Sequence, residues 1–311
     1  MKKLQILPLA AGAALLAAAT VSSAQARAHE VIYVDNPKFV APLVEKWIEE
    51  YAKVNPHVQI KRAESREKAD LRFTALTSSD DEGASSEVVT YVARFALLPV
   101  TTKANPLVGA LSKNRLDRKK LRKLFFADKD LASGEDNNKL NIANPVTVYS
   151  GSNAASAAPI YASYFGYSTA NLRGKKVSGD DIFLLNAIKK DAAGVTFNSL
   201  TYLYDTETRR LKEGLAILPL DVKKVQREVL YSNNIDQAIA LLEEEKIDVI
   251  PVPYIGAVYS REAAVAARDF ARWVITDGQQ YNHSYGFLNP DKKLLALQQQ
   301  QAKKQLLTSE K

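Results

Sequence analysis

Short runs of β-branched and aromatic residues alternate along this chain with segments whose apolar residues recur at helical spacing. The run Val31–Val34 is typical of a strand, and the apolar residues Leu43, Trp47 and Tyr51 behind it fall on one face of a helix. Further strands are expected at 58–60, 69–73, 146–149, 195–197, 215–218 and 247–252, and further helices at 117–126, up to 165, 180–190, 235–246, 261–275 and from 291 onward. This alternation predicts an α/β architecture with largely parallel sheets.

The composition excludes several classes of protein. A length of 311 residues suits two domains. The chain has 46% hydrophobic and 25% charged residues, and this composition is typical of a soluble globular protein rather than a disordered one. Cysteine is absent, which excludes disulfides, thiolate nucleophiles, cysteine-ligated zinc, iron–sulfur clusters and a lipid-modified cysteine. The only histidines, His29, His57 and His283, are scattered, so we expect no metal site and no cofactor.

The N-terminus has the pattern of a secretory signal peptide. Lys2 and Lys3 precede a largely apolar stretch, 4–21, and the segment 23–26 (Ser-Ala-Gln-Ala) supplies a small-residue cleavage site. A membrane anchor is the alternative, but the apolar stretch is short and ends in small residues. We expect residues 1–26 to be removed and the mature protein to be periplasmic. Cleavage removes Lys2 and Lys3, so the net charge of +7 falls by two. The mature protein is still positively charged, which favours anionic partners.

One segment has a physical reason to bind anions. Ser150-Gly151-Ser152-Asn153 lies between an expected strand and an expected helix. Gly151 permits close approach of the backbone to a ligand, and the amides after it belong to a helix N-terminus. The alternative is that Ser152 or Asn153 only caps the helix.

Other polar clusters have simpler interpretations. The acidic loop 78–82 lacks the regular spacing of a calcium site and is interpreted as a solvated loop. Asp180 and Asp181 are interpreted as residues at the start of a helix, where acidic side chains favour the dipole, rather than as an acid–base pair. The basic run 115–123 is interpreted as a solvated helix face, so no nucleic-acid partner is expected.

Four segments resemble the periplasmic phosphate-binding proteins of ABC importers, within the type 2 solute-binding superfamily. They are 39–47, where that family has a ligand loop and a helix, 91–100, which resembles its crossover, 149–152, where it has a Gly-Ser-Gly-Thr anion loop, and 270–279 followed by 285–287, which resembles its closing helix. The resemblance covers nearly all of the mature chain in order. It identifies the chain as a divergent member.

The resemblance implies an α/β fold of two lobes joined by two crossover strands. The crossovers are expected near 99–100 and 251–252. Lobe one is then expected to comprise residues 29–98 plus 255–311, and lobe two residues 99–254. The ligand would lie in the cleft between them.

The resemblance also places the ligand site, with departures from the family. Pro145-Val146-Thr147 stands where the family has a phosphate-binding arginine, so Lys38 or Arg66 would have to supply the positive charge. The family's aspartate, which accepts the proton of phosphate, has its counterpart in Asp80 or Asp81. The expected ligand-binding residues are Lys38, Phe39, Ser65, Asp80, Ser150, Gly151, Ser152 and Asn153.

The function implied is the capture of a small oxyanion, phosphate or a similar ion, by a monomer that does no chemistry on it. An ABC permease would be the partner. The main alternative is an envelope-associated structural or signalling protein that keeps the fold without transport. A phosphatase on the same fold is disfavoured, because no nucleophile–base or metal constellation is visible in the sequence.

Export gives the first testable prediction. Mass spectrometry of the exported protein should find an N-terminus at Arg27, or at His29 if the segment 26–28 (Ala-Arg-Ala) is cleaved instead. An intact Met1 in the periplasmic fraction would contradict the interpretation.

Overall fold

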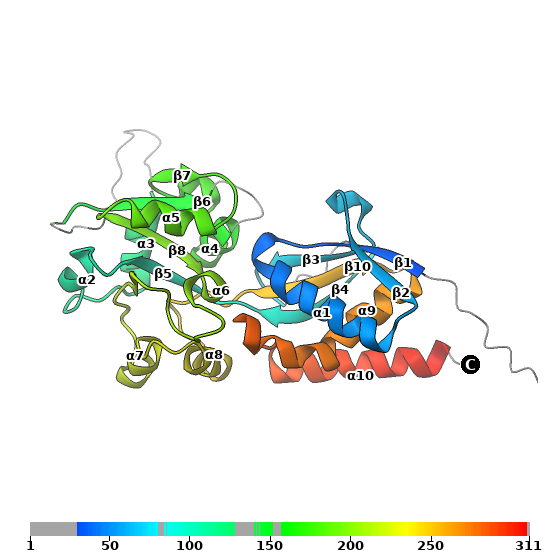
Figure 1. Cartoon of the computed structure of the whole chain (residues 1–311). Helices are drawn as coiled ribbons and strands as arrows, with labels where there is room; N and C mark the ends of the chain where they lie inside the picture. The colour runs from blue at the N-terminus through cyan, green and yellow to red at the C-terminus, as the bar shows by residue number, and fades with distance from the viewer. Residues whose placement is uncertain are drawn as a thin grey trace, which may run out of the picture.

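The computed structural model describes residues 30–79, 84, 86–127, 140, 142, 144–151 and 157–309, with side chains as far as residue 304. In this part of the chain, the strands form two five-stranded sheets that lie side by side (Figure 1). No helix among the described residues is long and apolar enough to cross a membrane.

The first sheet has the strand order β2-β1-β3-β10-β4. Its strands are β1 (Glu30–Asp35), β2 (Val58–Arg62), β3 (Leu71–Leu76), β4 (Glu87–Arg94) and β10 (Tyr254–Ser260). Strand β1 runs parallel to β2 and β3, whereas β10 runs antiparallel to β3 and β4. Its helical segments are η1 (Lys38–Val40), α1 (Ala41–Val54), η2 (Arg66–Lys68), α9 (Val265–Ile275), η4 (Asp277–Tyr281), η5 (His283–Tyr285) and α10 (Lys292–Ser309). Together these elements are the first lobe.

The second sheet has the order β7-β6-β8-β5-β9. Its strands are β5 (Leu97–Thr102), β6 (Thr147–Gly151), β7 (Lys175–Val177), β8 (Gly194–Ser199) and β9 (Leu215–Ile217). Its helical segments are α2 (Leu107–Ala110), α3 (Arg118–Phe125), α4 (Ala157–Phe165), η3 (Thr169–Asn171), α5 (Ile182–Lys189), α6 (Leu200–Leu203), α7 (Lys224–Leu230) and α8 (Ile235–Glu244). These elements are the second lobe.

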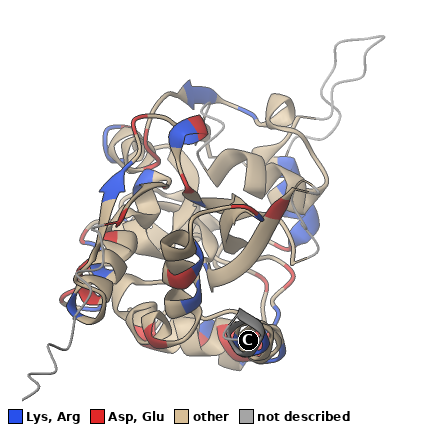
Figure 2. Cartoon of the chain, turned by 90° about the vertical axis from the view of Figure 1, so that its right-hand side faces the viewer, with Lys and Arg blue, Asp and Glu red and all other residues tan. Residues whose placement is uncertain are grey.

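Helix α1 shows how the sequence pattern becomes packing. Its apolar face is buried, and the Trp47 ring lies 5.4 Å from the Phe73 ring of β3. The Trp47 indole N–H donates to the Gly278 carbonyl at 2.9 Å, and a side chain at Gly278 would press on the indole. On its polar face, Lys46 pairs with Glu50 at 2.6 Å. Basic and acidic residues are similarly interspersed where the first lobe is seen end-on (Figure 2).

Two extended segments connect the lobes. The Phe95 amide donates to the Pro253 carbonyl at 3.0 Å, and the Leu97 amide donates to the Pro251 carbonyl at 3.0 Å. The two segments therefore run side by side as a double crossover. The division at residues 98/99 and 254/255 stays a prediction, while β5 begins at Leu97 in the second sheet.

The strand expected at 247–252 is wrong. The segment turns instead, with the Ile250 amide donating to the Ile247 carbonyl at 2.9 Å. The physical reason is that Pro251 and Pro253 have no N–H to donate to a sheet ladder, so the regular strand β10 begins only at Tyr254.

Candidate functional site

The crossover determines which loops of the two lobes face each other. In the first sheet, Tyr254 pairs with both Leu76 and Arg94, so the carboxyl end of β3 lies beside the crossover. In the second sheet, Leu97 pairs with Ser199, so the carboxyl end of β8 and of its parallel neighbour β6 points toward the same junction. Open α/β sheets bind ligands at the carboxyl ends of their strands.

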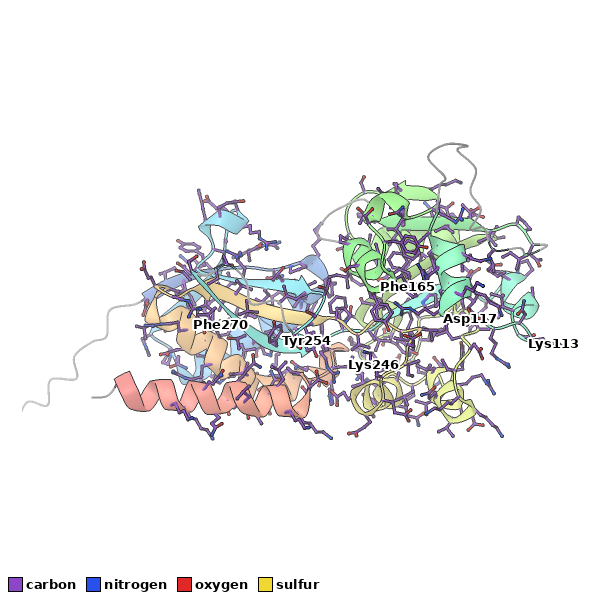
Figure 3. All side chains as sticks on the ribbon, turned by 180° about the vertical axis from the view of Figure 1, so that it is seen from behind. Lys113, Asp117, Phe165, Lys246, Tyr254 and Phe270 are labelled. Carbon is purple, nitrogen blue, oxygen red and sulfur yellow. The ribbon has the colours of Figure 1, made fainter. Side chains whose placement is uncertain are left out.

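A cavity of about 550 Å³ lies at this junction, and we call it the interlobe cavity. Figure 3 shows two of its lining residues, Tyr254 and Lys246, near the connection between the lobes. Hydroxyl side chains line it from both lobes: Thr77, Ser78 and Ser79 after β3, Ser163 and Tyr164 on α4, and Tyr254 on β10. Its described lining therefore suits a polar ligand.

The first charged group in the lining is already paired. Arg94 is 8% exposed and donates to the Asn289 carbonyl at 2.8 Å and to Asp291 Oδ1 at 3.1 Å. The other oxygen of Asp291 accepts a hydrogen bond from the Tyr254 hydroxyl. Burial, together with Asp291, raises the pKa of Tyr254 to about 12, so this hydroxyl stays protonated.

The three glutamates at the end of α8 are also paired. Glu243 lies 2.8 Å from His283 Nε2, Glu244 accepts from Lys292 at 2.7 Å, and Glu245 accepts from Gln226 at 2.8 Å. Lys246, which follows them, is exposed and makes no ion pair with any described residue. Among the charged residues described in the lining, Lys246 is the one whose side chain has no partner among the described residues.

Several of these pairs connect the two lobes. Glu243 of α8 accepts from the Asn289 amide at 2.6 Å as well as contacting His283. Arg209 of the second lobe donates to the carbonyls of His283, at 2.8 Å, and Ser284, at 3.0 Å. We call these contacts the latch. The hydrogen bond to Glu243 raises the pKa of His283. Burial by itself would raise the pKa of Glu243, but the hydrogen bonds with His283 and Asn289 outweigh burial and lower it.

The described part of the predicted anion loop is occupied by internal contacts. Ser150 is fully buried, accepts from Lys176 Nζ at 3.0 Å and donates to the Arg173 carbonyl at 3.4 Å. Lys176 also donates to the carbonyls of Leu172 and Thr169, so its ammonium has three acceptors from the protein. Partial burial lowers the pKa of Lys176. No local sequence pattern indicates this lysine, because it reaches Ser150 through the pairing of β6 with β7.

A carboxylate of the protein lies at the start of α4. Asp181 is 6% exposed, and its Oδ2 accepts from the Ala157 amide at 2.8 Å, whereas its Oδ1 has no hydrogen-bond partner among the described residues. Burial raises the pKa of Asp181 to about 6, although the Ala157 hydrogen bond opposes the rise. As the sequence predicts, Asp180 and Asp181 lie at the start of a helix, since Asp181 is the N-cap residue of α5. The Asp181 side chain makes no cap bond to α5, however, and accepts from the first residue of α4 instead.

The other predicted site residues are dispersed. Phe39 is buried, with its ring 4.8 Å from that of Phe95 at the crossover, and Lys38 beside it is exposed on η1. Ser65 is exposed before η2, and its neighbour Arg66 lines a separate cavity of about 350 Å³. Gly151 is buried at the end of β6.

Four of the predicted site residues lie outside the described residues: Asp80, Asp81, Ser152 and Asn153. None of the predicted residues that are described lines the interlobe cavity.

Within the described ranges, no group of three or more histidine or acidic residues is placed to hold a metal ion. The described lining of the interlobe cavity offers hydroxyl groups and the exposed ammonium of Lys246, beside Arg94 and four carboxylates that have partners within the protein.

Comparisons with known proteins agree with this architecture. No protein-family model and no curated protein sequence matches the chain. Among solved structures, a putative phosphate ABC transporter substrate-binding protein with bound phosphate from Clostridium perfringens matches with a TM-score of 0.57 and 14% identity, over 84% of this chain and 100% of that one. An ABC-type phosphate transport receptor from Vibrio cholerae matches with a TM-score of 0.55 and 14% identity, over the same shares.

A third structure, a possible phosphate-binding protein from Planctomyces limnophilus, matches with a TM-score of 0.50 and 13% identity, over 89% of this chain and 99% of that one. Likeness at this identity concerns the fold, and it extends over nearly the full length of all three proteins. The chain therefore has the two-lobed α/β fold of type 2 periplasmic binding proteins, as the sequence resemblance predicted.

Proposed function

We propose that this protein is an extracytoplasmic solute-binding protein that holds a small oxyanion of the phosphate class in the interlobe cavity. The fold supports the general role, since proteins of this architecture bind solutes between their lobes. No chemistry on the ligand is proposed. A periplasmic location, a monomeric state and delivery to an ABC permease belong to the same proposal and follow from the resemblance.

The unpaired side chain of Lys246 in the described lining of the interlobe cavity carries the proposal. The acidic residues described in its lining each have a partner within the protein, and Arg94 is paired with Asp291. Lys246 is left without an ion pair among the described residues, beside hydroxyl groups from both lobes. A small anion would meet the Lys246 ammonium there beside the hydroxyl groups of Ser79 and Ser163, whereas the hydroxyl protons of Tyr164 and Tyr254 are donated within the protein. Gly151, Ser152 and Asn153 stay a predicted second contact, since the Ser150 hydroxyl is engaged by Lys176 and Arg173.

A pair of variants tests which group binds the ligand. Lys246→Gln should weaken the binding of inorganic phosphate to ligand-stripped protein at least tenfold, because a hydrogen bond to a charged partner is worth about 1.5–3 kcal/mol. Ser150→Ala should leave that affinity unchanged and lower the free energy of unfolding by about 1 kcal/mol, since its hydroxyl contacts Lys176 and Arg173. Calorimetric titration and urea unfolding give the two quantities.

The matched control is Lys293→Gln, which removes an exposed lysine on α10 that does not line the cavity. Its phosphate affinity should equal that of the unmodified protein. Weakened binding in Ser150→Ala with unchanged binding in Lys246→Gln would contradict the cavity and favour the predicted loop. Sulfate and molybdate, titrated in parallel, give the selectivity.

The latch favours a second candidate function. Its contacts connect α8 and Arg209 to the segment 283–289, so a hinge opening would have to break them. Lobes held together in this way fit the structural or signalling role in the cell envelope. Absence of any phosphate, sulfate or molybdate binding by the unmodified, ligand-stripped protein would favour this role over solute capture.

The latch should depend on pH. Because Glu243 raises the pKa of His283, the stabilisation from His283 is complete below its ordinary pKa of about 6.5 and is lost as the pH rises through the raised value. The stabilisation from Glu243 is present above its ordinary pKa of about 4.3 and is lost below it. The pair should therefore be strongest between about pH 5 and pH 6.5.

The measurement is the stability gap between the unmodified protein and His283→Gln by urea unfolding. Since the His283 side chain is half exposed, we expect a gap of about 0.3–1 kcal/mol at pH 6 that shrinks at pH 9. Arg268→Gln, a change of an exposed residue on α9 away from the latch, should give the same small gap at both pH values. A His283→Gln gap that does not change with pH would show that charge has no part in the latch.

A further inference from the structure

A second cavity lies at the outer end of the second lobe. It has a volume of about 700 Å³ and is bounded by residues of α2, β9 and α7, and we call it the outer pocket. Figure 1 shows α2 and α7 at the end of the molecule away from the first sheet. Its volume falls within the range of sites that bind small organic molecules, about 300–1,000 Å³.

The floor of the outer pocket is apolar. Leu211, Leu215, Ile217 and Pro219 contribute to it. Tyr231 forms part of the wall and is held in place, because its hydroxyl donates to the Leu218 carbonyl and accepts from the Leu220 amide, both at 2.8 Å. The Tyr231 ring nevertheless remains 38% exposed. An apolar surface held in this way is preformed for an apolar group of a ligand.

Three cations surround this floor. Lys103, Arg115 and Arg227 line the outer pocket, and none of their side chains makes an ion pair with a described residue. The acidic residue described in the lining, Glu228, lies 3.9 Å from Lys224. Burial raises the pKa of Tyr231 to about 12, and the hydrogen bond from the Leu220 amide and the charges of Arg115 and Arg227 oppose that rise. Both arginines line the same pocket as Tyr231.

We propose that the outer pocket is a second ligand site that takes a small amphipathic organic anion. An apolar hydrocarbon or aromatic body would rest on the floor beside Tyr231, and a single carboxylate or sulfonate would lie beside Arg115 and Arg227. A bare inorganic anion would leave the apolar floor exposed to water, and a neutral hydrocarbon would leave the three cations uncompensated. Only a molecule that has both an apolar body and a negative charge would contact the apolar floor and the cations together.

Two probes test this chemistry on the full mature chain. The fluorescent anion 8-anilinonaphthalene-1-sulfonate should bind saturably at one site, and decanoate should displace it, whereas decanol should displace it at least tenfold less well. Added sodium chloride should weaken the binding of decanoate. Saturating phosphate should not alter it, so the outer pocket and the interlobe cavity can fail separately.

Variants locate the site. The double variant Arg115→Gln with Arg227→Gln should weaken decanoate binding at least tenfold, and Ala216→Phe, which fills the pocket from β9, should abolish it. The matched control, Lys189→Gln with Lys190→Gln, removes two exposed cations of the same lobe that do not line the outer pocket. Its affinity should be unchanged. Circular dichroism confirms that each variant is folded.

Four results would overturn the proposal. Three of them are the lack of saturable probe binding at millimolar concentration, equal affinity of decanoate for the folded double variant and the unmodified protein, and equal displacement by decanol and decanoate. Binding that is lost equally in the lysine control would assign the effect to the general charge of the lobe and would overturn the proposal as well.

Discussion

The two backbone hydrogen bonds of the double crossover are the contacts on which the rest of the structure depends. They join Phe95 to Pro253 and Leu97 to Pro251, and so fix two extended segments side by side. Because β4 and β10 end and begin there, the carboxyl end of β3 is brought opposite the carboxyl ends of β6 and β8. The interlobe cavity is a consequence of this arrangement, and its hydroxyl lining comes from elements far apart in the sequence.

Charge pairing then decides what this cavity suits. The glutamates of α8 form hydrogen bonds or ion pairs with His283, Lys292 and Gln226, and two of these partners belong to the first lobe. The contacts of Glu243 with His283 and of Glu244 with Lys292 therefore also hold the lobes together. The consequence is a closed arrangement with an exposed Lys246 at the junction, which fits an anionic solute and requires the latch to yield when the solute enters or leaves.

Much of the fold could be predicted from the sequence, because the local spacing of apolar residues indicates which segments are helices and which are strands. The buried face of α1, the helix after β6 that ends at Phe165 and the helical tail were all expected and are present. The apolar character of 247–252 predicts a strand, but no strand forms there because Pro251 and Pro253 have no N–H to donate to a sheet. The resemblance of several segments to a known family supplied the two-lobed arrangement.

The site could be predicted far less well, since its contacts depend on pairing between distant segments. Lys176 reaches Ser150 only through the register of β6 and β7, and Asp181 reaches α4 across the lobe. No local pattern reports such contacts. Lys246, the cation proposed to bind the ligand, follows three glutamates in the sequence. From that pattern alone it is one of several charges at the solvated end of a helix.

The most direct measurement is the position of a bound oxyanion. Crystals of the ligand-stripped protein soaked in arsenate, a tetrahedral analogue of phosphate with an anomalous signal, would show where the ion lies. We expect an anomalous peak in the interlobe cavity, within hydrogen-bonding distance of Lys246 and of hydroxyl groups from both lobes. A peak at the Ser150–Asn153 loop alone, or no peak between the lobes, would contradict the account.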